Sequence, residues 1–429
     1  MINAKKTHIA VIGIGRVGLP LAIVLADKGF NVFGIGRDQK KMDFINSGKM
    51  PFMEKGAKSL LAKSVGKNFI ATTDFSYIAK SDYIFLTLGT PIDENMNPVY
   101  DQIDSAINSI KEFLKPGQTL ILRSTVSPKT TQYVKSIINE IKNIKVGQNF
   151  FLAFCPERIA EGKAIEEIVT VPQLIGGVDL KSSIKAELLF KSIGIKTLVS
   201  DDISVELAKL YTNMYRYINL AIANEFFVLS DSYNKDIHEI INLVNFGYSR
   251  GGLSLPGLTA GPCLFKDGFF LISDLPFGDL ISTSWKINES IPLILVKKIR
   301  DEITLKNKKV AILGVAFKAD IDDTRESLSF KIRKALLREQ ADVILHDPYV
   351  SNYVNQTVEK DAYKAIKDAD VIIIATNHQE YYRLNLAKLK RLAKRNCLIS
   401  DIWNTLGTGK TQFYLKEVKA KRNKISKKD

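Results

Sequence analysis

A cysteine, a lysine and an aspartate lie close together in the stretch 256–267, which reads PGLTAGPCLFKD. If a helix begins near Pro262, Cys263 and Asp267 lie one turn apart on the same face, because side chains at positions i and i+4 are neighbours in a helix. A helix N-terminus and a nearby ammonium both favour the thiolate, which is the nucleophilic form of cysteine. Lys266, or a lysine from elsewhere, could supply that ammonium. The alternative is a buried structural cysteine, which is a common role for this residue type.

Two further polar residues lie one turn apart on a long apolar segment. Residues 205–229 are predicted to form a helix with apolar side chains around its whole circumference, so we expect it to be buried between domains or against a second subunit. Lys209 and Asn213 place an ammonium and an amide on one stripe of this helix. Buried polar groups need partners, unless the lysine reaches solvent at the helix edge.

A third group of candidates follows a predicted strand at 149–153. Cys155, Glu157, Arg158 and Glu161 come shortly after it. If this segment is helical, Glu157 and Glu161 share a face and offer two carboxylates for proton handling. The alternative is a pair of solvated surface residues, and we expect Cys155 to serve in packing.

The elements that position these residues begin with a glycine-rich turn near the N-terminus. A short apolar run at 8–12 is followed by the pattern GxGxxG and then by a helical stretch at 19–28. In this context the glycines permit a tight turn and the close approach of a pyrophosphate to the helix N-terminus. The turn residues predicted to bind a dinucleotide are Gly13, Gly15, Arg16, Val17 and Gly18.

The end of the second predicted strand, at 31–35, bears on the choice of cofactor. An acidic residue usually follows this strand and binds the adenosine ribose hydroxyls. Here the strand is followed by Gly36, Arg37 and Asp38. An arginine without that carboxylate tolerates a 2′-phosphate, so NAD and NADP are both open, and Asp38 could alternatively reach the ribose from the loop.

Further apolar runs at 83–88 and 119–122 alternate with helical segments, a pattern that predicts an α/β fold with a doubly wound parallel sheet. Ligands on such sheets bind outside the carboxyl ends of the strands. Thr90 and Thr125 follow these two runs. They are therefore candidates to line the cofactor crevice, with ordinary turn chemistry as the alternative.

A second unit of strands and helices begins near residue 308. It lacks GxGxxG, so we predict a second doubly wound, Rossmann-like domain that holds a different ligand. The segment 317–327, FKADIDDTRES, places Lys318 and Arg325 near one strand end. Both side chains suit contact with phosphate.

The composition limits the remaining possibilities. A chain of 429 residues with 45% hydrophobic residues is long enough for about two or three domains. It has no apolar run of about 18 residues, so we expect no membrane span, and its N-terminus leaves no room for a signal peptide, so we expect a cytoplasmic protein. The three cysteines and four histidines are too scattered for a metal site or a disulfide framework.

The formal net charge of +15 is concentrated partly in Lys-rich segments and in the C-terminal tail. A solvated basic tail is the simplest interpretation. A basic chain also suits anionic, phosphate-bearing ligands or a polyanionic surface. We predict no nucleic-acid partner.

Several motifs in register give the sequence a resemblance to the UDP-glucose/GDP-mannose dehydrogenase family of nucleotide-sugar 6-dehydrogenases, over about residues 9–404. The motifs are VIGIGRVGLPLA, Ser124-Thr125-Val126, Pro156-Glu157-Arg158, Glu206 with Lys209 and Asn213, GPCLFKD, and GVAFKADIDDTRES. The resemblance implies two doubly wound Rossmann-like domains joined by a central helical dimerisation region. It places an NAD(P) domain at 1–200, the helical and catalytic region at 201–300, a nucleotide-sugar domain at 301–412 and a basic tail at 413–429.

The resemblance also implies a shared chemistry. The C6 alcohol of the sugar is oxidised to an aldehyde, Cys263 captures it, and a second oxidation leaves a thioester that water hydrolyses to the uronic acid. Lys209 and Asn213 stabilise the oxyanion, Asp267, Glu157 and Glu161 handle protons, and Thr125 lies on the nicotinamide side. The residues implied for the nucleotide sugar are Glu157, Arg158, Lys209, Asn213, Arg250, Gly261, Phe317, Lys318 and Arg325.

The loop before the nucleophile differs from many relatives. It reads Thr259-Ala260-Gly261-Pro262 where many members have a Gly-Gly pair followed by a small residue or His. The TAGPCLFKD form resembles members that act on acetamido sugars, so we expect a UDP-linked N-acetylhexosamine. In a homodimer or higher oligomer built on the 205–229 helix, Arg250 could complete the partner's substrate pocket. The alternative is a solvent-facing loop arginine.

Two other classes of protein share part of this pattern. A two-electron hydroxyacid or hydroxyacyl dehydrogenase has the glycine turn and a catalytic Lys and Asn, but it needs neither the cysteine nor the third domain. A non-catalytic sensor of nucleotide sugars keeps the binding motifs and needs no nucleophile. The number of reduced cofactors formed per product separates the two dehydrogenases.

Overall fold

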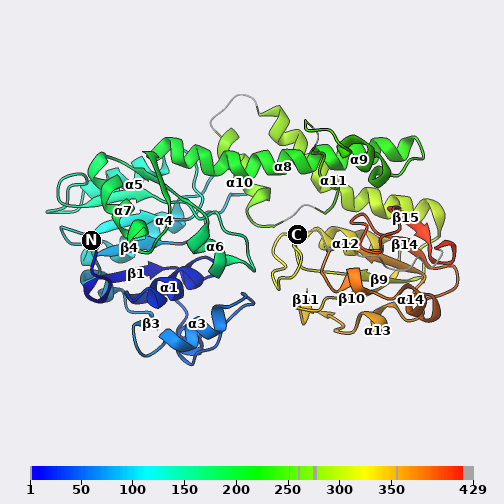
Figure 1. The fold of residues 1–429 in the computed structure, drawn as a ribbon, viewed down its shortest axis with the longest axis horizontal. Helices are drawn as coiled ribbons and strands as arrows, with labels where there is room; N and C mark the ends of the chain where they lie inside the picture. The colour runs from blue at the N-terminus through cyan, green and yellow to red at the C-terminus, as the bar shows by residue number, and fades with distance from the viewer. Residues whose placement is uncertain (1, 251, 259–260, 274–277, 354–355, 419–429) are drawn as a thin grey trace. The chain divides into compact units, whose positions relative to one another are not determined.

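Two α/β units make up the chain, and Figure 1 shows their elements in the computed structural model. The structure describes residues 2–250, 252–258, 261–273, 278–353 and 356–418. The first unit comprises Met1–Asn213 and Lys266–Phe277, and the second comprises Met214–Phe265 and Gly278–Asp429. Each unit has its own mostly parallel sheet, which confirms the predicted class of two Rossmann-like domains.

The first unit is built on an eight-stranded sheet with the order β3-β2-β1-β4-β5-β6-β7-β8. All neighbouring strands are parallel except β6 and β7. The strands are β1 (His8–Ile12), β2 (Asn31–Ile35), β3 (Phe69–Thr72), β4 (Tyr83–Leu86), β5 (Thr119–Leu122), β6 (Phe151–Phe154), β7 (Gln173–Gly177) and β8 (Thr197–Asp201). The strand order reverses between β1 and β4, which is where doubly wound sheets bind dinucleotides.

Helices cover both faces of this sheet because its strands are apolar on both faces. Ile9 and Val11 of β1 belong to one buried cluster with α1, and Ala10 and Ile12 belong to another with α4. The helices of the first unit are α1 (Gly18–Asp27), α2 (Gln39–Asn46), α3 (Ala57–Ser64), α4 (Asp101–Ile110), α5 (Thr130–Asn139), α6 (Ala164–Thr170) and α7 (Leu180–Ser192), with 3-10 turns η1 (Ala4–Lys6), η2 (Phe75–Lys80) and η3 (Lys111–Phe113).

The predicted long helix is α8 (Asp202–Ser232), drawn as one continuous green helix in Figure 1. One face is buried, with Leu210 and Tyr217 at 0% and 2% exposure, whereas Tyr211 and Tyr215 are 58% and 74% exposed. Burial on several sides is therefore not complete within one chain. Helix α8 is followed by α9 (Ile237–Asn245), α10 (Leu264–Ile272) and α11 (Asp279–Glu302).

The second unit has a five-stranded sheet with the order β10-β9-β13-β14-β15. Only β15 runs antiparallel to its neighbour. The strands are β9 (Lys309–Leu313), β10 (Asp342–His346), β13 (Val371–Ile374), β14 (Leu398–Ser400) and β15 (Gln412–Tyr414), beside a small hairpin of β11 (Asn352–Tyr353) and β12 (Gln356–Thr357). The remaining helices are α12 (Ser329–Arg338), α13 (Ala362–Ile366) and α14 (Leu386–Leu392), with 3-10 turns η4 (Tyr381–Arg383) and η5 (Leu415–Glu417).

Parts of the predicted loop and tail lie outside the described residues. Thr259 and Ala260 are outside, as is 419–429 of the basic tail, whose first residues belong to β15 and η5. Within the described ranges, none of the helices is long and apolar enough to cross a membrane.

Candidate active site

The glycine turn after β1 is packed tightly on one side and open on the other. Gly13 has a φ of 96°, and a Cβ there would lie 2.7 Å from the carbonyl oxygen of Thr87. A Cβ on Gly18 would lie 2.2 Å from the carbonyl oxygen of Gly13, whereas no described atom lies within 4 Å of a Cβ placed on Gly15. The first and third glycines are therefore required by packing, and the second leaves room for a pyrophosphate at the start of α1.

A pocket of about 410 Å³ opens at the carboxyl ends of β1, β2 and β4. Its lining includes Gly13, Gly15, Arg37 and Asp38 from the predicted cofactor set. This position at the reversal of strand order is the expected site for a dinucleotide. The other predicted cofactor residues, Arg16, Val17, Gly18, Thr90 and Thr125, are not among the described residues that line this pocket.

Arg37 and Asp38 are both engaged within the protein. The Arg37 Nη2 atom donates a hydrogen bond to Ser105 Oγ at 2.9 Å. Asp38 is the N-cap of α2, and its Oδ1 accepts from the Lys41 backbone N–H at 3.1 Å. Both side chains nevertheless border the pocket, so the residues present fit the ribose end of a dinucleotide.

The loops after β4 and β5 are tied to α10. Thr90 Oγ1 donates to the Thr125 carbonyl oxygen at 2.5 Å, and Lys266 Nζ lies 2.9 Å from Thr90 Oγ1 and also contacts the Thr90 carbonyl oxygen. The ammonium that we considered for activation of the Cys263 thiol is therefore hydrogen-bonded to Thr90. Both predicted threonines lie at the strand ends, as expected.

Lys209, Asn213 and Asp267 meet in the first unit. Asn213 Nδ2 donates to Asp267 Oδ2 at 2.6 Å, and Asp267 Oδ1 is buried without a hydrogen-bond partner among the described residues. Asp267 is fully buried, and this burial raises its pKa, while the charges of Lys266 and Lys209 oppose the rise. Lys209 is itself 7% exposed. A buried ammonium, an amide and a carboxylate therefore form one polar cluster.

Glu157 belongs to the same electrostatic environment. Burial of its carboxyl group raises its pKa, and the charges of Lys209 and Arg123 lower it. Arg123 is 3% exposed and donates from Nη1 to Gln173 Oε1 at 2.8 Å. We did not single out Arg123 from the sequence. Its signal was a charged residue directly after the apolar run 120–122 of strand β5.

Glu157 and Glu161 do not share a helical face, because the condition for it, a helical segment, is not met: residues 155–160 have no regular structure. Backbone N–H groups of this segment bind side chains instead of the carbonyl oxygens of a preceding turn. The Ile159 N–H is bonded to the Glu157 carboxylate, and the Ala160 N–H donates to Glu167 Oε2 at 2.6 Å. Such local competition for backbone donors prevents a helix.

The side chains of Glu54, Arg16 and Arg158 make contacts that hold this irregular segment and the residues after it. Glu54 accepts from the backbone N–H groups of Gly162 and Ala164 at 3.0 and 2.9 Å, a role that the sequence did not reveal. Glu161 Oε2 lies 3.8 Å from Arg16 Nη1, and Arg16 lies 5.0 Å from the Phe52 ring centroid. Arg158 is bonded to the Pro172 carbonyl oxygen.

Cys155 and the motif residue Glu206 have structural roles. Cys155 is fully buried, which raises its pKa to about 12, so it serves in packing as expected. Glu206 is also fully buried and accepts from the backbone N–H groups of Lys129 and Thr131 at 2.7 and 2.8 Å. It thereby anchors α8 to the segment that follows β5 and contains Thr125.

Cys263 belongs to the second unit and directly precedes α10, which begins at Leu264. This agrees with the helix start predicted near Pro262. The Cys263 residue is exposed, whereas the other two cysteines are buried. Its place at a helix N-terminus favours the thiolate.

The loop before Cys263 packs against the predicted nucleotide-binding segment within the second unit. Gly261 has a φ of 113°, and a Cβ on it would lie 2.7 Å from Phe317 Cδ2. Lys318 is half-buried in the same segment. Arg325 is exposed and donates from Nε to both oxygens of Asp323 at 3.0 and 2.9 Å. Arg250 is exposed, with its guanidinium 5.1 Å from the Tyr248 ring centroid.

A sheet with the strand order of dinucleotide-binding domains, together with a buried Lys–Asn–Asp cluster, is typical of a nicotinamide-dependent dehydrogenase. Comparison with known families agrees: the NAD binding, central and UDP binding domains of the UDP-glucose/GDP-mannose dehydrogenase family match residues 7–194, 203–289 and 311–408. The chain belongs to this family, which confirms the resemblance noted from its motifs.

Named relatives match along almost the whole chain. A UDP-N-acetyl-D-mannosamine dehydrogenase of Methanococcus aeolicus is 30% identical over 93% of this chain and 91% of its own length. Its counterpart from Methanocaldococcus jannaschii is 31% identical over 94% of both chains. Among solved structures, the UDP-D-ManNAc dehydrogenase of Pyrococcus horikoshii superposes with a TM-score of 0.84 at 29% identity, covering 90% of this chain and 93% of its own.

Proposed function

We propose that this enzyme oxidises the C6 alcohol of a UDP-linked N-acetylhexosamine, with UDP-N-acetylmannosamine as the first candidate, to the corresponding uronic acid, a precursor for polysaccharide synthesis. The observation that carries the proposal is full-length similarity, at about 30% identity, to dehydrogenases named for UDP-N-acetyl-D-mannosamine. The departure of the loop before Cys263 from the usual Gly-Gly form supports an acetamido sugar by analogy only.

NAD is the cofactor that the family match supports, because its first domain is an NAD binding domain. The comparisons give no support to NADP. Gly13, Gly15, Gly18, Arg37 and Asp38 would hold the adenosine and pyrophosphate parts. Bound NAD would supply the hydride acceptor for two successive two-electron oxidations.

The side chains then divide the remaining chemistry. The Cys263 thiolate adds to the C6 aldehyde, and the resulting oxyanion is stabilised by the Lys209 ammonium and the Asn213 amide. The second oxidation leaves a Cys263 thioester, and water hydrolyses it to the acid and the free thiol. Asp267 orients Asn213 through their hydrogen bond.

Proton transfer is assigned to partly or fully buried carboxyl groups. Burial raises the pKa of Asp267 and of Glu157, which brings both closer to the range useful for acid–base catalysis at neutral pH. Glu161 is assigned to orienting water, and Thr125 to the nicotinamide side of the cofactor. These assignments follow the family resemblance.

The nucleotide sugar is assigned to residues of both predicted binding regions. Phe317, Lys318 and Arg325 would contact the UDP part, since the matched UDP binding domain covers all three. Gly261 and Arg250 would contact the substrate from the loop before the nucleophile. Glu157, Arg158, Lys209 and Asn213 would face the sugar.

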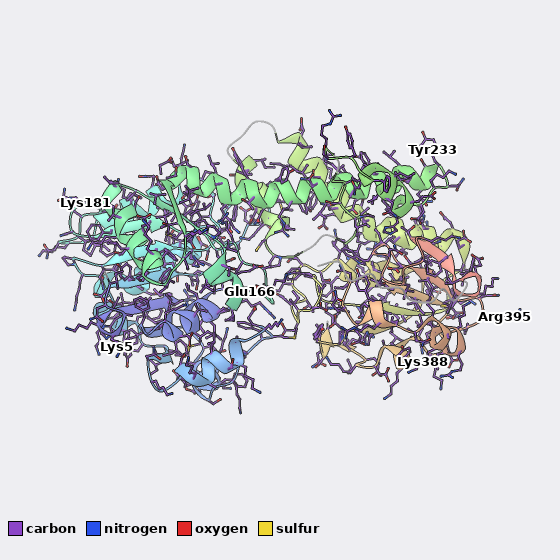
Figure 2. The ribbon with its side chains drawn as sticks, viewed as in Figure 1. Lys5, Glu166, Lys181, Tyr233, Lys388 and Arg395 are labelled. Carbon is purple, nitrogen blue, oxygen red and sulfur yellow. The ribbon has the colours of Figure 1, made fainter. Side chains whose placement is uncertain are left out.

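Association of two copies through α8 is supported by exposed apolar side chains in the second unit. A groove of about 400 Å³ there is lined by residues that include Phe226, Leu229, Tyr233 and Val244. Tyr233, labelled in Figure 2 just after the end of α8, is 76% exposed. Because monomeric proteins rarely leave such a surface uncovered, we propose a homodimer or a higher oligomer built on this helix.

The proposed function is tested by supplying the purified enzyme with NAD and a panel of nucleotide sugars: the UDP-linked N-acetyl forms of mannosamine, glucosamine and galactosamine, UDP-glucose and GDP-mannose. We expect turnover of an N-acetylhexosamine with two NADH formed per uronic acid. A preference for UDP-glucose or GDP-mannose would overturn the acetamido assignment. One NADH per product would indicate a two-electron dehydrogenase.

A further inference from the structure

A buried polar network lies at the carboxyl ends of β9, β10 and β13 in the second unit. Asp347 and His378 are both fully buried, and His378 Nε2 lies 3.1 Å from Asp347 Oδ2. Neither residue has a part in the chemistry described above. Fully satisfied buried networks of this kind fix one conformation of the segments that they join.

Asp347 binds the first part of the segment that leads to the predicted nucleotide contacts. Its Oδ2 accepts from the backbone N–H groups of Val315 and Ala316 at 2.8 and 3.1 Å. Its Oδ1 accepts from the backbone N–H groups of Tyr349 and Val350 at 2.9 and 3.1 Å. Each carboxylate oxygen therefore holds the backbone on a different side of the network.

His378 binds the same segment further on. The Asp320 backbone N–H donates to His378 Nδ1 at 2.8 Å, so Nδ1 is the acceptor and the ring proton is on Nε2, facing Asp347. The segment is closed by a hydrogen bond from the Phe317 backbone N–H to the Asp323 carbonyl oxygen at 2.9 Å.

The two network residues thus fix the backbone on both sides of Phe317 and Lys318. Thr376 adds a third attachment, because its Oγ1 donates to the Ala316 carbonyl oxygen at 2.6 Å. The phenyl ring of Phe317 packs against Gly261, two residues before Cys263. Displacement of the segment would therefore move the predicted nucleotide contacts at Phe317 and Lys318.

We propose that Asp347 and His378 are positioning residues for nucleotide recognition, which hold the backbone of 315–320 so that Phe317 and Lys318 meet the UDP part of the substrate. This inference rests on the proposed nucleotide-sugar function. Recognition sites depend on supporting hydrogen bonds of this kind, because a small misplacement of the contacting groups costs affinity.

Substitutions of His378 can remove its two hydrogen bonds, to Asp347 and to the Asp320 backbone N–H, one at a time. In His378→Gln the side-chain amide can still donate to Asp347 but cannot accept from the Asp320 N–H. In His378→Asn the side-chain oxygen can still accept from the Asp320 N–H but the donor to Asp347 is lost. His378→Leu removes both hydrogen bonds. Asp347→Asn replaces one acceptor oxygen of the carboxylate by an NH2 donor that faces backbone N–H groups.

Asp370 provides a matched control at the opposite ends of the same strands. It is 6% exposed, and its Oδ2 accepts from the Lys309 backbone N–H at 2.9 Å and from Lys394 Nζ at 2.8 Å. Asp370→Asn therefore disturbs a buried carboxylate of the same sheet far along the strands from 315–320. It should cost stability without affecting nucleotide recognition.

The test measures the binding of UDP and of NAD to the full-length protein by calorimetry, together with kcat, KM and the melting temperature. We expect Asp347→Asn and His378→Leu to weaken UDP binding and raise KM by about tenfold, because hydrogen bonds to a charged group are lost. The dissociation constant for NAD and the kcat of the saturated enzyme should each change by less than about threefold. His378→Gln and His378→Asn should fall between these variants and the wild type.

Unchanged UDP binding in His378→Leu, or an equal loss in Asp370→Asn, would show that the network has only a structural role and would overturn the inference. If Asp347→Asn does not fold, the milder His378 variants decide the matter. Failure of the wild-type protein to bind UDP would instead refute the proposed function itself.

Discussion

The side-chain amide of Asn213 on α8 donates a hydrogen bond to the buried carboxylate of Asp267 on α10, with 2.6 Å between Nδ2 and Oδ2. These residues are far apart in sequence, and the bond fixes the amide that we assign to the oxyanion. The charge of Lys209 also acts on this carboxyl group and lowers its pKa against the effect of burial.

Replacing Asp267 by Asn should therefore lower kcat by about 100-fold, because the variant keeps the size of the side chain but loses its charge and its proton-accepting capacity. NAD binding should be unchanged, because Asp267 is not among the described residues that line the cofactor pocket. Steady-state rates with saturating substrate and NAD titrations measure the two effects. Wild-type kcat in this variant would remove Asp267 from the catalytic cluster.

Cys263→Ser should abolish uronic acid formation and leave NAD binding within about twofold of the wild type, because only the covalent step is lost. Cys155→Ala is the matched control, since Cys155 is buried in the core of the first unit, and its folded fraction should retain activity. Retention of full oxidation to the acid by Cys263→Ser would contradict the nucleophile assignment.

The three thiols provide a second measurement of the same assignment. Cys263 is exposed, whereas burial raises the pKa of Cys155 and of Cys397 to about 12. Brief treatment of the native protein with iodoacetamide should therefore modify Cys263 alone, as read by peptide mass spectrometry, and should inactivate the enzyme in proportion.

The features that the sequence predicted well are local ones. The GxGxxG turn, the strand ends at Thr90 and Thr125, and the start of α10 near Pro262 all depend on glycines, prolines and apolar runs within a few residues. The Lys209 and Asn213 stripe likewise follows from helical spacing. A regular period is enough to find such elements because the backbone repeats itself.

The features that were missed or wrong depend on contacts between distant residues. Glu54 accepts a hydrogen bond from the Gly162 backbone N–H, 108 positions away in the sequence, and no local sequence pattern predicts that bond. The helix that would place Glu157 and Glu161 on one face does not form, because side-chain carboxylates, including that of Glu167, bind the backbone N–H groups that a helix needs. The Asp347 and His378 network is of the same kind, since its partners come from separate strand ends.

Acid should destabilise the second unit through His346. Burial lowers its pKa from 6.5 to about 4, while the neighbouring Asp347 and Asp361 raise it and His378 lowers it further; Glu380 Oε1 also lies 3.6 Å from Nε2. A depressed pKa in the folded state means that the unfolded chain binds the proton more tightly, so stability is lost as the pH falls from 6.5 towards 4. The expected loss is about 2 kcal/mol at pH 5 and about 3 kcal/mol below pH 4.

Urea unfolding at pH 7, 6 and 5, followed by fluorescence, measures this dependence. In His346→Asn the amide can still bond the Tyr381 hydroxyl, which lies 3.0 Å from His346 Nδ1, but the titrating group is gone. The variant should therefore lose most of the difference between pH 7 and pH 5. An unchanged pH dependence would show that another group is responsible.

Gly36→Asp should increase the preference for NAD over NADP by about tenfold, because the new carboxylate would bind the adenosine ribose hydroxyls and repel a 2′-phosphate. Gly36 lines the pocket with Arg37 and Asp38. A Cβ at this position would lie 2.7 Å from Met42 Cε, and the flexible end of that methionine can move aside. Gly36→Ala is the control for this steric effect, and it should leave the ratio of kcat/KM for the two cofactors unchanged. An equal ratio in Gly36→Asp and Gly36→Ala would show that residue 36 does not face the ribose.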